Sequence, residues 1–360
     1  MFTPGNQSRP WLWWAALPYR WIARLRALVY EQEWRRPQRL PVPVISVGNL
    51  TVGGTGKTPL VIQFTQWLLA EGKRVGVLSR GYRRTSTEPL LIVSDGRSLL
   101  AGPDQAGDEP YLIARRCPQA VVAVGADRHR LGRWVLEQYS LDCIVLDDGY
   151  QHLGLHRDAN LLLLDATDSE GLDDVVPVGR LREPLTAARR ATGIVITRAD
   201  HPQQIENVLA RCKKVLEAMP PVSLVRFQPS GLVGVRTGAM QPIEAVRGKR
   251  ALLVSGVGHT GSFRRTVDLL GVSVLEEVAY PDHYRYEQRD VDEFRSKAAA
   301  LKAEYVLTTE KDAGKLVPYL SSAETDWWAV RVEPEWLQGQ AAIHRVLAQL
   351  VSAGPGRGHA

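Results

Sequence analysis

Short apolar runs alternate with amphipathic stretches along most of this chain. The apolar runs are predicted strands: Val42–Val47, Val75–Leu78, Leu90–Val93, Val121–Val124, Ile144–Asp147, Leu161–Asp165 and Ile194–Thr197. Stretches between many of them repeat apolar residues at helical spacing and are predicted helices: Lys57–Ala70, Glu109–Arg116, Arg128–Gln138 and Gln203–Leu216. Continuous apolar strands separated by helices are typical of a parallel sheet covered on both faces. The pattern therefore predicts an α/β fold with a largely parallel sheet.

The pattern changes between residues 222 and 243. Two apolar segments there flank QPSG (228–231) with no helix between them, which predicts a two-stranded hairpin linker. Strand and helix alternation then resumes and ends in an amphipathic helix over Trp336–Val351. This organisation predicts a core domain over 31–221, a linker over 222–243, a smaller α/β domain over 244–352 and a disordered tail over 353–360.

Residues 1–30 carry an unusual mixture of aromatic and basic side chains. Four of the ten tryptophans of the chain are interleaved there with arginines: Trp11, Trp13, Trp14 and Trp21, with Arg20, Arg24 and Arg26. The positive charge follows the apolar part, whereas a secretory signal peptide has it first. A helix packed on the domain is one interpretation. A helix lying in the membrane interface is favoured, because clustered indole rings are costly to leave in water. Pro18 argues against one uninterrupted helix.

Composition narrows the class of protein. The formal net charge of +6 over 360 residues suits phosphorylated ligands, nucleic acid or an anionic membrane, and the absence of a long basic run argues against nucleic acid. The three cysteines, Cys117, Cys143 and Cys212, lie far apart, which argues against a disulfide framework or a zinc site and favours a reducing compartment. No apolar stretch reaches the length needed to span a bilayer.

A phosphate-binding loop follows the first predicted strand. Its residues are Thr51, Val52, Gly53, Gly54, Thr55, Gly56, Lys57 and Thr58. In GxxxxGK[ST] the backbone N–H groups surround the phosphates of a nucleotide at the N-terminus of a helix, the lysine reaches the β- and γ-phosphates and the hydroxyl binds Mg²⁺. Thr51 stands where the pattern has its first glycine. A strand before the loop and a helix after it provide the context that the motif requires, so the core is predicted to be of the P-loop NTPase type.

A second motif supports a nucleotide site. The run CIVLDD (143–148) is apolar and ends in Asp147 and Asp148, the form of a strand whose carboxylate binds the nucleotide's Mg²⁺ together with Thr58. Alone, the run would be read as a strand that ends in two solvated acids. Because both motifs occur in order, a site for ATP or GTP with Mg²⁺ is predicted. Which aspartate binds the metal first stays open.

Seven motifs in one order carry a resemblance to a known family. They are Val44–Pro59, Leu78–Arg84, Gly107–Pro110, Asp147–His152, Gly179–Pro184, Pro281–Tyr286 and Thr309–Asp312. Together they closely resemble the tetraacyldisaccharide 4'-kinases, over about residue 10 to about residue 320. The resemblance implies ATP and Mg²⁺ as cofactors, an acylated glucosamine disaccharide lipid as acceptor, peripheral location on the cytoplasmic face of the Gram-negative inner membrane, and a substrate cleft between two domains.

The resemblance also implies roles for Asp108 and His283. Asp108 of GDEP is implied as the base that accepts the proton of the attacking hydroxyl, and His283 of PDHYRY is implied as its partner. Lys57 of the phosphate-binding loop is the third catalytic candidate. From the residues alone, Asp108 would be read as the N-cap of the helix that follows it. His283 alone would be read as an ordinary loop histidine.

Several further residues are substrate candidates whose roles stay open: Glu109, Arg80, Tyr82, Arg83, Arg128 and Arg182. Solvated arginines at a strand end are an equal alternative for Arg80 and Arg83. Gln151 and His152 could orient water or metal ligands, or serve in structural hydrogen bonds. The resemblance places Glu310–Asp312 near the nucleotide without assigning contacts.

Two other function classes remain open on sequence alone. Thr197–Asp200 (TRAD) is faintly similar to the [NT]KxD motif that recognises guanine, although Arg198 replaces the lysine, so a membrane-associated P-loop GTPase or ATPase switch is the alternative. A binding module that uses nucleotide only structurally is another. A monomer is favoured as the oligomeric state.

Removal of residues 1–30 is expected to move the protein from the membrane fraction to the soluble fraction. The loss includes apolar area and the three arginines Arg20, Arg24 and Arg26, each worth roughly 1 kcal/mol near anionic lipid, which corresponds to peripheral attachment. Flotation with anionic vesicles measures the partition. An unaltered partition after truncation would show that the segment packs on the domain instead.

Overall fold

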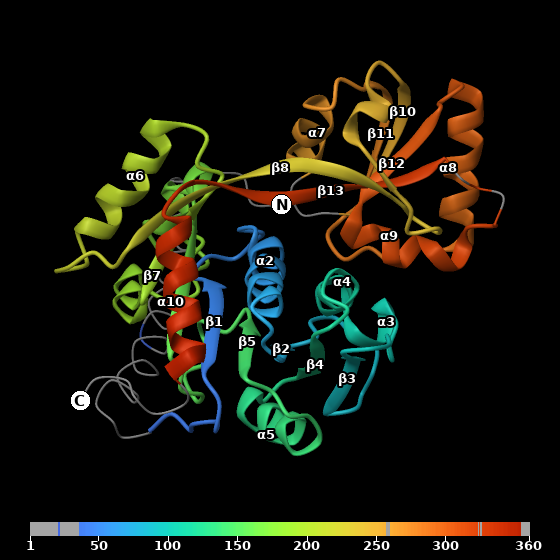
Figure 1. The fold of residues 1–360 in the computed structure, drawn as a ribbon. Helices are drawn as coiled ribbons and strands as arrows, with labels where there is room; N and C mark the ends of the chain where they lie inside the picture. Colours follow the sequence, from blue (N-terminus) through green and yellow to red (C-terminus); the bar gives the residue numbers. More distant parts are fainter. Residues whose placement is uncertain (1–20, 22–35, 257–259, 323, 325, 354–360) are drawn as a thin grey trace.

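The computed structural model describes residues 21, 36–256, 260–322, 324 and 326–353 (Figure 1). The predicted interfacial helix within residues 1–30, apart from Trp21, therefore lies outside the described residues. The predicted tail beyond Ala353 lies outside them as well.

Within the described residues the strands form one large, mostly parallel sheet. Their bounds are β1 (Val44–Asn49), β2 (Val75–Ser79), β3 (Leu90–Asp95), β4 (Val121–Gly125), β5 (Cys143–Asp147), β6 (Ala159–Asp165), β7 (Gly193–Thr197), β8 (Val222–Gly234), β9 (Met240–Gln241), β10 (Arg250–Ser255), β11 (Ser273–Ala279), β12 (Tyr305–Thr309) and β13 (Trp327–Gln338). The order is β11-β10-β12-β13-β8-β7-β6-β1-β5-β2-β4-β3, with β9 paired to β8. Only the β3–β4, β8–β9 and β8–β13 pairs among these are antiparallel. The predicted α/β class and largely parallel sheet are confirmed.

Helices cover both faces of this sheet. Their bounds are α2 (Lys57–Ala70), α3 (Pro103–Ala106), α4 (Asp108–Arg116), α5 (Arg128–Gln138), α6 (Pro202–Lys213), α7 (Thr260–Asp268), α8 (Gln288–Leu301), α9 (Glu310–Leu316) and α10 (Gln340–Ala353). Because successive residues of a strand point to opposite faces, Val77 packs with Phe64 of α2 whereas Leu78 packs with Leu131 of α5. No helix in the described ranges is long and apolar enough to cross a lipid bilayer.

Two long strands connect the larger N-terminal part (36–221) to the smaller C-terminal part (244–326), as Figure 1 shows for β8 and β13. The hairpin predicted around QPSG (228–231) is wrong, because β8 runs straight through this sequence. β8 pairs with β13, about 100 residues later in the chain, and Ser230 is left over at a bulge between the Pro229–Val332 and Gly231–Arg331 pairs. The local turn signal of Pro and Gly is outweighed by this long-range pairing.

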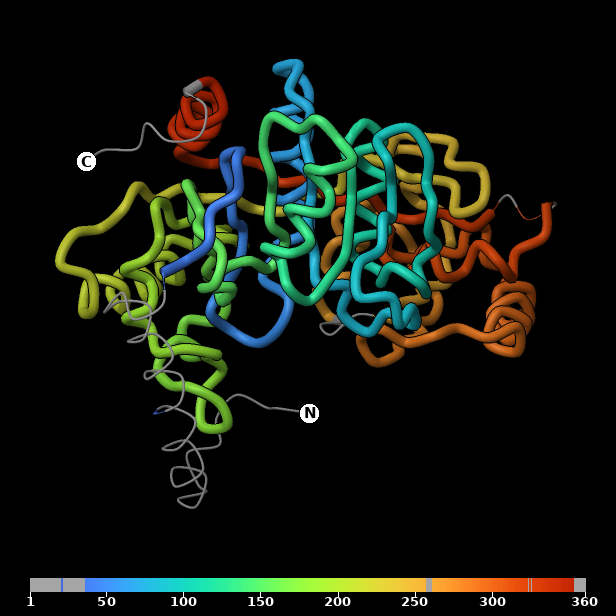
Figure 2. The backbone as a smooth tube through the Cα atoms, turned by 90° about the horizontal axis from the view of Figure 1, so that it is seen from below, coloured from blue at the N-terminus to red at the C-terminus, as the bar shows by residue number. Residues whose placement is uncertain are grey.

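The last helix packs back on the N-terminal part (Figure 2). The helix predicted from Trp336 begins only at Gln340, since Trp336 is still in β13, where its indole N–H donates to Oε1 of Gln63 in α2 (2.6 Å). Ile343 and Leu347 of α10 join the core cluster of α2. The predicted domain over 244–352 therefore includes a helix that packs on the other part. The division of the chain at residues 221 and 243 stays a prediction.

Truncation of one buried phenylalanine in each part tests this division. Phe294 is fully buried among C-terminal residues, and Phe64 is fully buried under the N-terminal sheet. Phe294→Ala is expected to lower the free energy of unfolding of the C-terminal part by about 3–5 kcal/mol, through lost burial and a cavity. Calorimetry should then show one of two thermal transitions shifted, with Phe64→Ala shifting the other. A single transition that both variants shift equally would contradict two separate domains.

Candidate active site

The phosphate-binding loop leaves the end of β1 and enters α2 at Lys57. Gly56 is the residue before the helix and has a left-handed backbone (φ +78°). A Cβ at this position would lie 2.2 Å from the ring of Phe227, which reaches the loop from β8. Glycine is therefore required both by the backbone angle and by the packing of the connecting strand.

Neighbouring segments hold the loop through its backbone. The N–H of Val52 donates to the carbonyl of Arg180 (2.7 Å). The hydroxyl of Thr197 donates to the carbonyl of Thr55 (3.0 Å), and the guanidinium of Arg198 donates to the carbonyl of Gly54 (3.0 Å). Arg198 also pairs with Asp165. The TRAD residues that suggested a guanine-binding motif thus support the loop itself.

Lys57 and Asp148 lie together at the mouth of the loop. The Lys57 ammonium lies 3.0 Å from Oδ1 of Asn49 and 3.5 Å from Oδ1 of Asp148, and Arg182 donates to Oδ2 of Asp148 at 3.0 Å. Burial alone would raise the pKa of Asp148. The charges of Lys57 and Arg182 outweigh burial and hold that pKa below its usual value.

The surroundings of Asp147 shift its pKa in the opposite direction. Its side chain is buried at the end of β5, Oδ2 accepts from the Ser79 hydroxyl (2.8 Å), and Oδ1 is buried without a hydrogen bond. Burial, followed by the charges of Glu109 and Asp148, raises the pKa of Asp147 to about 7. An uncompensated carboxylate of this kind fits a cation.

The residues present fit magnesium. Among the described residues no three His, Cys, Asp or Glu side chains form one ligand cluster. The candidate ligands are the two neighbouring aspartates at the end of β5, Asp147 and Asp148, and the hydroxyl of Thr58 at the start of α2. Two carboxylates and a hydroxyl suit Mg²⁺, which commonly keeps several waters and binds substrate phosphates.

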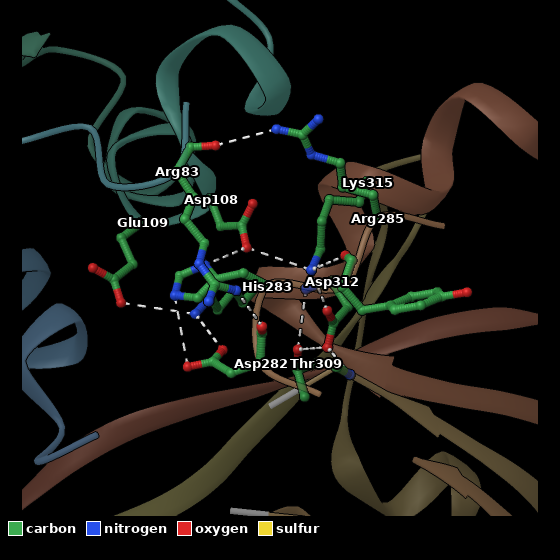
Figure 3. Close-up of polar contacts among 12 residues, drawn as sticks. Arg83, Asp108, Glu109, Asp282, His283, Arg285, Thr309, Asp312 and Lys315 are labelled. Carbon is green, nitrogen blue, oxygen red and sulfur yellow. Dashed lines mark hydrogen bonds and ion pairs between the residues drawn. The ribbon is translucent and has the colours of Figure 1, made fainter. Parts of the chain in front are cut away.

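Asp108 does not cap its helix. The N-cap of α4 is Gly107 (φ +93°), and Asp108 is the first helical residue. Its Oδ2 lies 3.2 Å from Nδ1 of His283 and 3.4 Å from the ammonium of Lys315 (Figure 3). The cap interpretation is therefore wrong, because the carboxylate points away from its own backbone to partners in the C-terminal part. The structure does bring Asp108 and His283 together.

The partners of Asp108 favour its ionised form. Burial would raise the pKa of Asp108, but the hydrogen bond from His283 and the charges of Lys315 and Lys311 lower it below the usual value. Both contacts are made to Oδ2, so Oδ1 accepts no hydrogen bond from the described residues. A charged carboxylate with one oxygen that accepts no hydrogen bond from the described residues can accept a proton from a hydroxyl group.

Lys311 and Lys315 extend this group. The sequence analysis left the role of Lys311, in the TEKD motif, open and did not single out Lys315. Lys311 bridges Oδ1 of Asp282 (2.9 Å) and Oε1 of Glu109 (3.8 Å). Lys315 is almost fully buried and binds Oδ1 of Asp312 at 2.7 Å. Two lysines four residues apart on α9 lie on one helix face, and that spacing was the signal available.

The residues of the TEKD motif lie at the seam between the two parts. Asp312 is fully buried, and its carboxylate also accepts a hydrogen bond from the Thr309 hydroxyl (2.7 Å). The carboxylate is therefore held in position where it binds Lys315. The carboxylate of Glu310 forms ion pairs with Arg116 of α4 (2.7 Å) and with Arg331 of β13 (3.0 Å). These contacts connect α9 with α4 and with β13.

The other substrate candidates have different surroundings. Arg182 contacts Asp148 as described. Arg128 is buried at the start of α5, donates to the carbonyl of Ala126 (2.8 Å) and leaves its Nε without a partner. Burial, with Arg80 nearby, lowers the pKa of Arg128. Tyr82 is largely exposed and meets the ring of His283 edge-on (5.4 Å between centroids).

Gln151 has a structural contact next to the phosphate-binding loop. Its amide donates to the carbonyl of Asn49 (2.7 Å) at the end of β1. The backbone N–H of His152 donates to the carbonyl of Gly149 (3.0 Å) in the turn after β5. Both contacts shape the chain beside the two aspartates.

Known proteins match this chain over nearly its whole length. A family model for LpxK, described as tetraacyldisaccharide-1-P 4'-kinase, matches residues 8–352. A tetraacyldisaccharide 4'-kinase of Pelobacter propionicus is 41% identical over 302 residues, covering 84% of this chain and 81% of the relative. One of Anaeromyxobacter dehalogenans is 37% identical over 337 residues, covering 93% and 88%. The crystal structure of LpxK from Aquifex aeolicus in complex with ATP is 32% identical with a TM-score of 0.76, covering 94% of this chain and 98% of that one.

The raised pKa of Asp147 predicts a pH dependence of stability in magnesium-free buffer. The folded protein holds this proton more tightly than the unfolded chain, so the stabilisation is present below about pH 4 and is lost as the pH rises through about 7. Asp147→Asn is expected to remove this loss and to unfold at higher temperature than the wild type at pH 8. Thermal unfolding at pH 5 and pH 8 measures the difference.

The control for this experiment is Glu137→Gln, at an exposed position of α5. This variant should follow the wild type at both pH values. If Asp147→Asn also followed the wild type, Asp147 would not titrate in this range.

Proposed function

This chain belongs to the tetraacyldisaccharide-1-phosphate 4'-kinase family, and from that premise we propose that it transfers the γ-phosphate of ATP to the 4'-hydroxyl of an acylated glucosamine disaccharide 1-phosphate. The family resemblance seen in the seven motifs is confirmed. The chain is a phosphotransferase that acts on an alcohol group, a kinase of lipid A biosynthesis. The Aquifex relative crystallised with ATP supports ATP as the donor.

The contact between Asp108 and His283 is the observation that carries the proposal. Asp108 begins α4 in the N-terminal part, while His283 follows β11 in the C-terminal part, so the pair exists only where the two parts meet. Glu109, the next residue, raises the pKa of Asp147 through its charge, which relates the pair to the candidate magnesium site. In kinases, a carboxylate of this kind accepts the proton of the attacking hydroxyl.

The proposed reaction assigns each group a task. The 4'-oxygen of the acceptor forms a bond to the γ-phosphorus, and the bond from that phosphorus to the β,γ-bridging oxygen breaks. The hydroxyl proton passes to Asp108, which His283 orients and Lys315 keeps ionised. Lys57 neutralises charge on the phosphates.

Magnesium is part of the proposal. Thr58, Asp147 and Asp148 would hold it, and its charge would offset the negative charge of the nucleotide phosphates. The buried Oδ1 of Asp147, which has no hydrogen bond from the protein, supports this assignment.

Location at the cytoplasmic face of the inner membrane is also proposed. It rests on the aromatic and basic segment over residues 1–30 and on the lipid acceptor of the related enzymes. Closure of the two parts around the acceptor would complete the site, because each part supplies one member of the Asp108–His283 pair.

Replacement of the proposed base is expected to remove transfer but not nucleotide binding. Asp108→Asn should lower kcat by about 10²- to 10⁴-fold, because an amide cannot accept the proton. The measurement is transfer of labelled γ-phosphate from ATP to a lipid A disaccharide precursor, with ATP binding measured in parallel. His283→Ala should lower kcat as well.

The matched control is Asp268→Asn, an exposed aspartate at the end of α7 that pairs with Arg264 and lies outside the site. This variant should keep wild-type kcat. Unchanged transfer by Asp108→Asn would remove the base assignment. A wild-type protein that used GTP and left the lipid unmodified would favour the switch alternative.

A further inference from the structure

A cavity of about 390 Å³ opens beside the Asp108–His283 pair. Both members of the pair line it, and so do four basic side chains: Arg83, Arg84, Arg285 and Lys315. Asp104 and Asp108 are the acidic residues of the lining. Positive charges therefore outnumber negative ones in a cavity that already reaches the proposed base. This excess predicts an anionic ligand.

Two of the four basic groups are already engaged. Lys315 is bound to Asp312 (2.7 Å) and to Asp108 (3.4 Å), as described above. Arg84 donates to the backbone carbonyls of Glu88 and Val124, so its guanidinium shapes the loop that carries it. Neither group needs a ligand to satisfy it.

Arg83 and Arg285 differ from these two. Arg83 donates to the carbonyl of Asp282 (3.0 Å), and Arg285 donates to the carbonyl of Arg83 (3.4 Å), as Figure 3 shows. Within the described residues neither guanidinium forms an ion pair with a carboxylate. Both side chains are exposed, so a ligand can reach them. Both arginines line the same cavity without a carboxylate partner among the described residues, so a bound anion would offset their charge.

The backbone holds these residues in an uncommon conformation. Arg83 has φ +58° and His283 has φ +63°, both in the left-handed region that non-glycine residues rarely adopt. Such strain persists only where the surrounding structure enforces it, and it gathers at ligand sites. The loop after β2, which carries Arg83, and the loop after β11, which carries His283, both line this cavity.

The chemistry of the acceptor identifies the anion. The acceptor named in the family description already carries a phosphate at position 1, on the other sugar from the 4'-hydroxyl that receives the new one. The phosphates of the nucleotide are served by Lys57 and the loop at 51–58. An acceptor whose hydroxyl lies at Asp108 extends into the cavity that Arg83 and Arg285 line.

We propose that Arg83 and Arg285 form a subsite for the 1-phosphate of the acceptor, a phosphate monoester that is bound but not transferred. The planar fork of a guanidinium matches phosphate oxygens in a bidentate manner. The inference rests on the proposed function. Because Arg83 belongs to the N-terminal part and Arg285 to the C-terminal part, the bound phosphate also holds together the two parts that supply Asp108 and His283.

The test compares two acceptors in detergent micelles, one with the 1-phosphate and one with a free 1-hydroxyl. Arg83→Gln and Arg285→Gln are each expected to raise KM for the phosphorylated acceptor by about 10- to 100-fold, the effect of a lost charge-assisted hydrogen bond. KM for the 1-hydroxyl acceptor and KM for ATP should not change. Arg285→Lys should recover part of the loss, since it keeps the charge without the fork.

The control is Arg289→Gln, an exposed arginine paired with Glu287 outside the cavity. It should leave KM for both acceptors unaltered, and thermal unfolding confirms that each variant is folded. Variants that raise KM equally for both acceptors would overturn the subsite.

Three other outcomes would also overturn the proposed subsite, and the first of them concerns the source of the phosphate. If Arg83→Gln and Arg285→Gln lost only a stimulation by added phosphatidylglycerol vesicles and treated the two acceptors alike, the arginines would bind membrane headgroups and the proposal would be overturned. A wild-type protein that phosphorylated neither acceptor would overturn the proposed function, and this inference with it. Transfer to both acceptors by the wild type with the same KM would overturn the subsite alone.

Discussion

The antiparallel pairing of β8 with β13 is the constraint on which the arrangement of the molecule depends. Trp328 pairs with Gly234 at one end and Gln338 pairs with Leu224 at the other, so the two strands carry the sheet from one part into the other. The same ladder presents Phe227 to Gly56 in the phosphate-binding loop. The position of the C-terminal part is therefore set by strands that also pack on the nucleotide-binding loop.

Three aspartates show how the same carboxyl group acquires different properties in one site. Asp147 is buried with no cation of the described residues in contact, and its pKa rises to about 7. Asp148 and Asp108 are each close to basic side chains, and their pKa values fall below the usual value. Cation contacts, which come from other segments of the chain, decide whether the pKa of a buried carboxyl rises or falls.

Much of the N-terminal sheet and its nucleotide motifs could be predicted from the sequence, because strands such as β5 and helices such as α2 are encoded by local apolar patterns. The hairpin at QPSG was predicted wrongly, since the partner of β8 is distant in sequence. Asp108 was read as a cap from the residues alone because position before a helix is a local signal, whereas its contact with His283 joins residues 175 positions apart. Lys315 was missed for the same reason.

The nine residues of α4 are held at both ends by the C-terminal part. Arg116 at the end of the helix binds Glu310 (2.7 Å) and Glu333 (2.8 Å), and Asp108 at its start meets His283 and Lys315. A helix tied in this way acts as a spacer of fixed length and phase. One inserted or deleted residue would shift its ends by about 1.5 Å and rotate them by about 100° relative to each other. The length of α4 between Asp108 and Arg116 is thus as constrained as the identity of these two residues.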